Sequence, residues 1–481
     1  MPSPQLEQQQ SLSPVGQSPK LQQQTSGNCI INDSPLTEEK QLSEKTNYSL
    51  QSKQDEPRGT VLSATASILK GGIGTGILFL PSTFQACGIG LSIIFMVICA
   101  VVSYFCWSLI CKIIRFQEST DTKDPTNKNL TLEATGGKFY GKSFLIFLQA
   151  CTYIYAYSSC FAYSIFIYQT LDLIIPNDMV VMAIMFAFYL PLSMYKNIDK
   201  LSIFTYLGLS ATIITLIIII GKSCEVINTT NVNFSSLTKF DFTQIPLQFG
   251  VFSFAYDVNG MYTEVHASMK NKNDFDSVLR YYLSIFTLLG IFVGMMGYIA
   301  FGADTQAVIF QNIGSMGGVG TALDFLYSFS ILASILLYVF TVVKFLDSII
   351  QKHIIKNSTK CMNLFQQVGL RSVIFFSFTF LAQYVNQISN VFNILGCIFC
   401  TILTYICPLL FYIKAVKKQK SILNTIQNGD IEKDIIQAKP NISFLDVHYK
   451  YYILSGMSFI FGLLGGISGL VSTIIQIQQG S

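Results

Sequence analysis

The chain is poor in charged residues and in histidine. Asp, Glu, Lys and Arg make up only 12% of its 481 residues, whereas soluble domains carry about 25%. None of its three histidines has a nucleophile or a second metal ligand at a useful spacing. We therefore expect the protein not to be an enzyme, and we expect no metal, no cofactor and no nucleic-acid partner.

Apolar residues, in contrast, make up 51% of the chain, which has 39 Phe, 24 Tyr and a mean hydropathy of +0.47. This composition indicates an all-α integral membrane protein with many spans in the lipid bilayer. Residues 1–57 differ, because they are rich in Gln, Ser and Pro and have too few apolar residues to bury a core. We predict a disordered cytosolic tail over 1–57 and an eleven-helix membrane domain over 58–476.

The distribution of positive charge decides between ten and eleven spans, because the candidate at 370–386 is short. Eleven spans with a cytosolic N-terminus place 28 of the 31 Lys and Arg residues in cytosolic segments, in accord with the positive-inside rule. Ten spans would put the lysines of 414–420 on the wrong side. The loop 222–246 then lies outside, where Asn228 and Asn233 are predicted glycosylation acceptors. The other predicted spans, each about 20 residues or longer, are 60–84, 88–111, 143–175, 178–195, 201–221, 247–268, 282–301, 321–346, 388–413 and 449–475.

The first span contains four glycines beside a lysine, in the run Leu69-Lys70-Gly-Gly-Ile-Gly-Thr-Gly-Ile-Leu-Phe-Leu-Pro81. Glycines at this density unwind a helix, and unpaired backbone groups persist in a membrane only where protein buries them or they line a cavity. Lys70 lies about ten residues into the span and is costly there without a partner, so it marks a candidate functional site. The alternatives are close helix packing by the glycines and snorkelling of Lys70 to the interface.

The sixth span is interrupted as well, as expected if two inverted repeats of five helices build the domain. Asp257 and Asn259 lie in mid-span, and Glu264 follows. The eleventh span would then lie outside the repeats. Asp257 is predicted to contact a substrate or a coupling ion, or alternatively to pair with Lys70. Glu264 either takes part in transport or stabilises a helix N-terminus.

The two breaks together predict a dipolar binding site. Free carbonyls at the end of the first half-helix favour a cation, and free N–H groups at the start of the next favour a carboxylate. Carbonyls around Tyr256, with Asp257, would receive an ammonium group, so the site matches an α-amino acid. Tyr153, Tyr157 and Ser158 in the third span are further candidates. The expected substrate-binding residues are Gly71, Gly72, Gly74, Thr75, Gly76, Phe254, Ala255, Tyr256 and Asp257.

At these residues the chain resembles the amino acid/auxin permease family (amino-acid transporter, transmembrane domain). Arg58-Gly59-Thr60 leading into 72–81 is similar to the family's first-helix signature, and Phe254-Ala255-Tyr256 followed by Tyr262-Thr263-Glu264 is similar to its sixth-helix motif. The resemblance covers about residues 58–475. It implies a LeuT-type fold, with a 5+5 inverted repeat and an eleventh helix, and amino-acid transport coupled to H⁺ or Na⁺ by alternating access.

The first-helix motif is most similar to that of proton-coupled members. Sodium-coupled members carry an Asn that helps hold Na⁺ where this chain has Lys70, and a Thr that aligns roughly with Ala333. A fixed ammonium group there supplies the charge internally, which favours H⁺ symport and leaves Na⁺ coupling as the alternative. A nutrient-sensing receptor using the same site is another alternative, and the membrane is either the plasma membrane or a vacuolar or lysosomal one. The expected ion-coupling residues are Lys70, Ser330, Ser334, and Asp257 or Glu264 as the proton carrier.

Overall fold

A computed structural model describes residues 59–120, 130–172, 175, 177–193, 198–230, 234, 237–259, 261–314, 320, 322–323, 325–335, 338–339, 342, 364–385, 387–427 and 449–480. All of them belong to one compact unit, Pro57–Ser481. The predicted tail over 1–57 lies outside the described residues.

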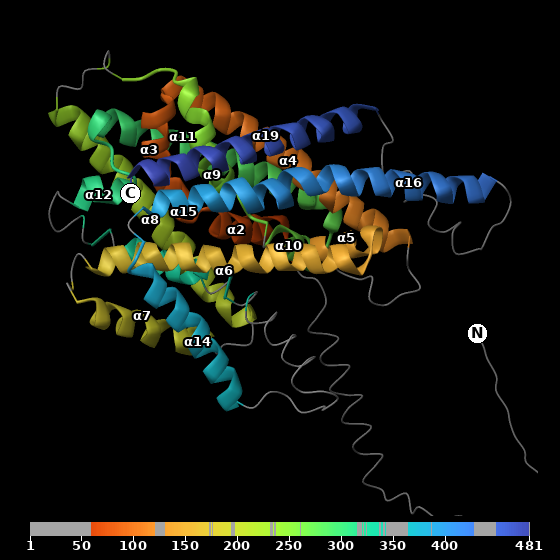
Figure 1. The fold of residues 1–481 in the computed structure, drawn as a ribbon, viewed down its shortest axis with the longest axis horizontal. Helices are drawn as coiled ribbons and strands as arrows, with labels where there is room; N and C mark the ends of the chain where they lie inside the picture. Colours follow the sequence, from red (N-terminus) through yellow and green to blue (C-terminus); the bar gives the residue numbers. More distant parts are fainter. Residues whose placement is uncertain are drawn as a thin grey trace, which may run out of the picture. The chain divides into compact units, whose positions relative to one another are not determined.

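The described residues are almost entirely helical (Figure 1). The longer helices are α2 (Val61–Gly72), α3 (Leu80–Cys87), α4 (Ile89–Thr120), α5 (Leu132–Tyr140), α6 (Lys142–Asp172), α7 (Asp178–Ser193), α8 (Ile198–Thr229), α9 (Ile245–Ala255), α10 (Tyr262–Ser268), α11 (Phe275–Phe301), α12 (Ile309–Gly314), α14 (Leu364–Ala382), α15 (Ile388–Leu395), α16 (Cys407–Gln427) and α19 (Tyr449–Gly480). Short 3₁₀ turns are η1 (Thr75–Phe79), η4 (Phe242–Gln244), η5 (Lys272–Asp274) and η6 (Gly302–Asp304), and η7 (Gly396–Ile406) is a π-helix.

Among the described residues, six helices are long and apolar enough to cross a membrane, and the bent pair of α2 with η1–α3 makes a seventh candidate. Three shorter apolar helices, Asp178–Pro191, Phe325–Ile335 and Arg371–Ala382, fall on three further predicted spans, and α9 with α10 falls on the sixth. The chain is therefore a multi-pass membrane protein, as predicted. The count of eleven crossings and the cytosolic N-terminus stay predictions.

Local sequence explains where the first span breaks. α2 begins with a capping box, in which the Ser63 N–H donates to Thr60 Oγ1 at 3.3 Å and the Thr60 N–H donates to Ser63 Oγ at 3.0 Å. The helix ends at Gly72, within the glycine cluster, where each glycine weakens a helix by about 1 kcal/mol relative to alanine. Pro81 at the start of α3 favours helix again, and the axis bends by 51°.

The sixth span is interrupted between Ala255, where α9 ends, and Tyr262, where α10 begins. Turns replace the helix there, because the Asp257 N–H donates to Phe254 O at 3.0 Å and the Met261 N–H to Val258 O at 2.9 Å. Both predicted broken helices are thus present. Their relation by an inverted repeat stays a prediction.

The last helix, predicted to lie outside the repeats, packs closely on the second broken span and on η7. A Cβ on Gly462 of α19 would lie 2.4 Å from Tyr405 Cβ, and one on Gly465 would lie 2.1 Å from a ring carbon of Phe249. Glycines at these positions therefore let α19 approach both elements. We conclude that α19 supports α9, the first half of the sixth span.

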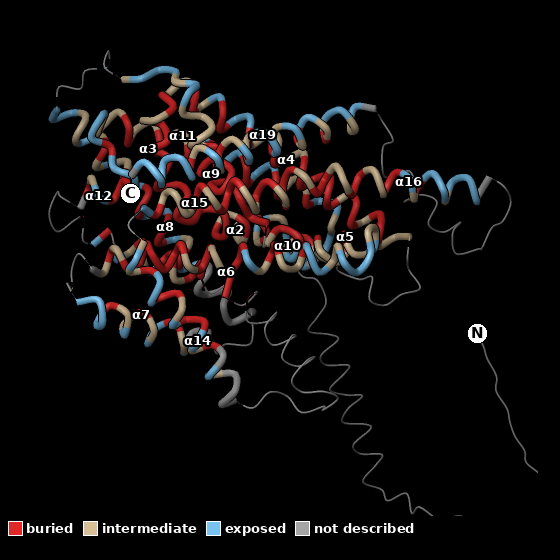
Figure 2. Tube along the Cα trace, in the orientation of Figure 1, coloured by how far each residue is buried: buried red, intermediate tan, exposed pale blue. Residues whose placement is uncertain are grey.

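Burial is concentrated around the two breaks, where α9 and the end of α2 are buried (Figure 2). The exposed side chains of the long helices are largely apolar. Val101 of α4 is 63% exposed and Leu288 of α11 is 70% exposed. Exposed aliphatic residues along helices of this length match a surface that faces lipid.

Candidate functional site

The ammonium group of Lys70 is bound inside the protein. Lys70 lies in the last turn of α2 and is 1% exposed. Its Nζ donates to the backbone oxygen of Ser330 at 2.9 Å and to Ser330 Oγ at 2.8 Å. Ser330 belongs to the helical segment Phe325–Ile335, in the predicted eighth span. Because the charge is held by protein oxygens, Lys70 does not snorkel to the interface.

Two residues of α8 complete this site. Ser330 Oγ donates to the backbone oxygen of Gly208 at 2.8 Å and is hydrogen-bonded to Thr212 Oγ1. A Cβ on Gly208 would lie 2.8 Å from Lys70 Cε, so glycine leaves room for the lysine stem. Sequence reasoning missed Gly208 and Thr212. Their only signal is a small residue and a hydroxyl four positions apart, a pattern common in membrane helices.

Ser334 lies one turn beyond Ser330 and is 1% exposed. Its hydroxyl has no hydrogen-bond partner among the described residues. The Lys70 ammonium group therefore bonds to Ser330 and not to Ser334, although both serines lie in the same buried segment.

The glycines of the first break make close contacts with other elements. Each would place a Cβ within 3 Å of another residue: Gly71 of Met261, Gly72 of Tyr282, Gly74 of Tyr163, and Gly76 of Ala255. Close packing, an alternative for these glycines, is therefore present at all four. A binding function is compatible with this packing, because the described residues offer no hydrogen-bond acceptor to the backbone N–H of Thr75 or Gly76. Thr75 is also fully buried, with an unpartnered hydroxyl.

Asp257 is a buried carboxylate at the second break, 4% exposed. Its Oδ1 accepts hydrogen bonds from the backbone N–H of Asn259, at 3.2 Å, and from Asn259 Nδ2. The Asn259 amide continues to Thr404 Oγ1 of η7 at 2.8 Å. π-helical segments often occur at functional sites. Within the described part of the chain no ion pair joins Asp257 to Lys70, so the pairing alternative is not found.

Four buried tyrosines lie close enough to the Asp257 carboxylate to interact with its charge. They are Tyr155 and Tyr163 of α6, Tyr282 of α11, and Tyr338. The Tyr155 hydroxyl and the Cys400 thiol approach the carboxylate, but neither makes a well-formed hydrogen bond to Oδ2. Asp257 Oδ2 is thus a buried acceptor in an aromatic environment.

The third span presents a different face from the one expected. Tyr153, Tyr157 and Ser158 are only partly buried, and the Tyr157 hydroxyl bonds to Ser377 Oγ of α14 at 2.7 Å. Tyr155 and Tyr163 are the tyrosines of this helix that lie near Asp257.

Tyr256, Phe254 and Ala255, which were also expected at the second break, lie where α9 ends. The Tyr256 carbonyl accepts from the Tyr282 hydroxyl at 3.0 Å, and the Tyr256 hydroxyl bonds to Thr287 Oγ1 at 2.9 Å. The Phe254 ring packs on that of Phe392 in a tilted arrangement, with 4.6 Å between the ring centres. The backbone of Ala255 lies against Gly76, which joins the two breaks directly.

Glu264 and Asp257 lie in different environments. Glu264 is exposed in the first turn of α10, where a negative charge favours the helix N-terminus. Of the two candidate proton carriers, Asp257 is therefore the buried one.

Other expected positions lie away from the breaks. Asn228 is exposed near the end of α8, and Asn233 lies outside the described residues. The described residues contain no group of three or more His, Cys, Asp or Glu side chains that would hold a metal ion.

Residues 57–431 match the family described as "Transmembrane amino acid transporter protein". The chain belongs to this family. It is a family of transporters rather than of enzymes.

Curated relatives of this chain are distant. Vacuolar amino acid transporter 3 of Saccharomyces cerevisiae is 24% identical over 301 residues, which are 60% of this chain and 42% of the relative. The chain thus spans less than half the length of the yeast transporters that it matches. Amino acid transporter ANT1 of Arabidopsis thaliana is 22% identical over 384 residues, covering 76% of this chain and 87% of the relative.

A solved structure, MhsT in complex with L-phenylalanine, superposes with a TM-score of 0.52 over 85% of this chain and 99% of that one, at 10% identity. The chain therefore has the LeuT-type fold that its sequence predicted. At this identity the likeness concerns the fold alone.

Proposed function

We propose that this protein is a secondary active amino-acid transporter that couples transport to protons by alternating access. The observation that carries the proposal is the Lys70 ammonium group, hydrogen-bonded to both oxygens of Ser330. An internal cation at this position takes the place of a bound sodium ion, so a different ion must drive transport.

The substrate would bind between the two breaks. Its carboxylate would accept hydrogen bonds from the backbone N–H groups of Thr75 and Gly76, which have no acceptor among the described residues. Its ammonium group would approach Asp257, whose Oδ2 has no hydrogen-bond partner among the described residues. The Tyr256 carbonyl is less suited to the ammonium, because the Tyr282 hydroxyl already donates to it.

Asp257 is the better candidate than Glu264 for the proton carrier. Burial disfavours the charged form of a carboxylate, whereas a positive charge beside it favours that form. The protonation of a buried carboxylate therefore responds to the ligand or charge that arrives next to it. Glu264 is exposed in the first turn of α10, beyond the break, so it is the less suited of the two to respond to a ligand in the site. In symport, Asp257 would take up its proton on the side where the substrate binds and would release it, with the substrate, on the other side.

The membrane of an acidic vacuolar or lysosomal compartment would supply the proton gradient. Support comes from the names of the yeast relatives, which are vacuolar amino acid transporters. The plasma membrane is the alternative that localisation of the tagged full chain would test.

The decisive experiment is uptake of a labelled amino-acid mixture into proteoliposomes containing the full chain. A pH gradient and a sodium gradient are imposed separately. We expect uptake under the pH gradient and no response to sodium. Uptake driven by sodium would overturn the role of Lys70 and turn attention to the Ser334 hydroxyl, which has no hydrogen-bond partner in the described part of the chain. Absence of uptake under both gradients, with retained amino-acid binding, would favour a nutrient sensor.

A further inference from the structure

The starting end of α2 and the far end of α10 are joined through their backbones. The Gly59 N–H donates to Ser268 O at 3.0 Å, and the Lys270 N–H donates to Gly59 O at 3.0 Å, forming an isolated parallel bridge between Gly59 and Met269. A Cβ on Gly59 would lie 3.0 Å from Ser268 O, so the two chains are in direct contact. The half-helices before the first break and after the second therefore share one anchor.

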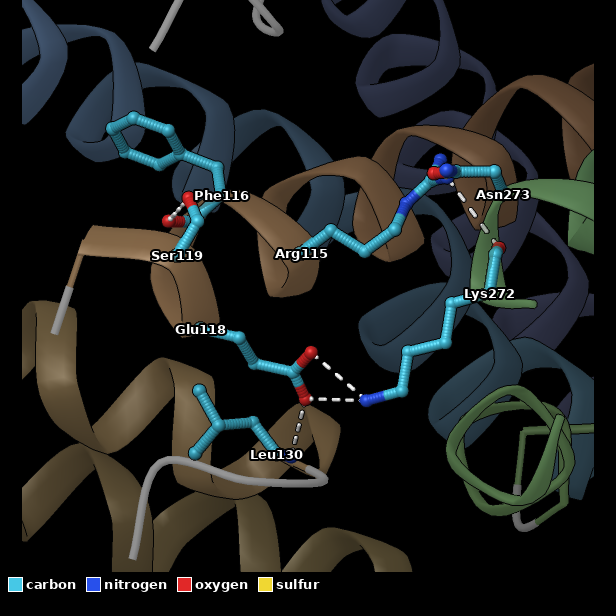
Figure 3. A network of polar contacts seen from close by, with 7 residues as sticks. All are labelled: Arg115, Phe116, Glu118, Ser119, Leu130, Lys272 and Asn273. Carbon is cyan, nitrogen blue, oxygen red and sulfur yellow. Dashed lines mark hydrogen bonds and ion pairs between the residues drawn. The ribbon is translucent and has the colours of Figure 1, made fainter. Parts of the chain in front are cut away.

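An ion pair fixes the next residues to α4 (Figure 3). Lys272 Nζ donates to Glu118 Oε1 at 3.0 Å and to Oε2 at 2.9 Å. Glu118 lies near the end of α4, and its Oε1 also accepts from the Leu130 N–H at 3.1 Å. Beside this pair, an Arg115 guanidinium nitrogen donates to Asn273 Oδ1 at 2.6 Å. The short turn η5 that follows α10 is thus held to α4 by two side chains.

The ion pair between Lys272 and Glu118 is largely buried and joins two separate elements. The Lys272 and Glu118 side chains are 23% and 16% exposed, and loss of one partner would leave the other charge partly buried. For comparison, Lys222 and Glu225 form a pair at 2.7 Å within α8, where Glu225 is 61% exposed. That second pair joins neighbouring turns of a single helix and connects no separate elements.

We propose that Glu118 and Lys272 are positioning residues that close this end of the transporter. The pair holds η5 on α4, and the Gly59–Met269 bridge extends that hold to both half-helices, α2 and α10. Opening of this end requires the pair to separate or to move with them. Its consequence for transport rests on the proposed function, but closure itself is measurable without transport.

The test measures access to α2 in the full chain. Ala64 of α2 is 4% exposed, and Ala64→Cys provides the reporter thiol. To avoid background labelling, Cys224, which is only partly buried, is first replaced by serine, as are Cys29 and Cys361, which lie outside the described residues. The rate of modification by a water-soluble thiol reagent then reports opening. The variants are Glu118→Gln, Lys272→Gln, both together, and Lys272→Arg, with Lys222→Gln as the matched control.

We expect each single glutamine variant to raise the modification rate about tenfold, within the range for side chains that interact directly. The double variant should resemble the single ones, because either change removes the whole pair. Lys272→Arg should keep the slow rate, and Lys222→Gln should leave it unchanged. Equal rates in all variants, or additive effects of the two glutamine changes, would overturn the proposal.

A transport measurement separates positioning from a general loss of structure. Glu118→Gln keeps an acceptor for the Leu130 N–H and is the mildest change. We expect it to alter KM and maximal uptake rate by different factors, because it shifts the population of one conformation. Faster modification without uptake in any variant would refute the proposed transport function and leave the positioning role standing.

Discussion

Replacement of Lys70 by methionine separates a functional lysine from a structural one. Methionine keeps the length and flexibility of the side chain without its charge. We expect Lys70→Met to lose most proton-driven uptake while the protein stays folded. A lysine retained for stability would give the opposite result.

The expected change in stability is small, because two large contributions oppose each other. The two hydrogen bonds to Ser330 each contribute about 1.5–3 kcal/mol, as bonds to a charged donor do. Burial of an ammonium group without an opposite charge costs several kcal/mol, and no acidic side chain among the described residues pairs with Lys70. The net change in the free energy of unfolding should therefore stay within about 2 kcal/mol.

The assay combines thermal unfolding in detergent with uptake into proteoliposomes under a pH gradient. Lys222→Met is the control, since Lys222 lies near the end of α8 in a partly exposed ion pair. In Lys70→Ala the oxygens of Ser330 and Thr212 remain, so added Na⁺ or methylammonium should restore part of the uptake. Normal proton-driven uptake by Lys70→Met would refute the reasoning.

Two further pairs of variants test the breaks. Asp257→Asn should abolish proton-driven net uptake, because a fixed neutral group cannot release a proton. Exchange of labelled for unlabelled amino acid should persist in this variant. Glu264→Gln should change net uptake less than about twofold, since Glu264 is exposed. The reverse order of the two effects in the same assay would identify Glu264 as the carrier. Gly76→Ala should lower the free energy of unfolding by about 1–3 kcal/mol and reduce uptake, because its Cβ would lie 2.8 Å from the Ala255 backbone. Gly221→Ala, inside α8 with open space around it, should raise the free energy of unfolding by up to about 1 kcal/mol and leave uptake unchanged. A Gly76→Ala melting curve that matches the Gly221→Ala curve would contradict the close contact between the breaks.

The breaks themselves could be predicted because their chemistry lies in the residue types. Four glycines within an apolar run cannot sustain a helix, and Pro81 favours a new helix start wherever it occurs. A lysine among apolar residues needs oxygen partners whatever the fold. Lys70, Asp257 and the interruption at 256–261 were therefore visible without the structure.

The partners across the helices could not be predicted, because they depend on how each helix is rotated. Two positions along a helix correspond to about 200° around its axis. Tyr153, Tyr155 and Tyr157 are the same residue type in one helix, so the sequence does not distinguish which of them lines the site. Of the three, Tyr155 is the one that interacts with Asp257. A helix that is apolar on every side gives no periodic signal of its inner face. Thr212 was missed for the same reason.

The anchors at the two ends of α2 are mechanically connected. The helix has twelve residues and is about 18 Å long. At its start Gly59 is bonded to the segment that Lys272 and Glu118 hold on α4, and near its end Lys70 is bonded to Ser330. A helix held at both ends swings only when at least one of these bonds opens, so each anchor lowers the population in which the other is released. Because such coupling is reciprocal, weakening the bond between Lys70 and Ser330 should itself speed modification at position 64, even with the pair of Glu118 and Lys272 intact.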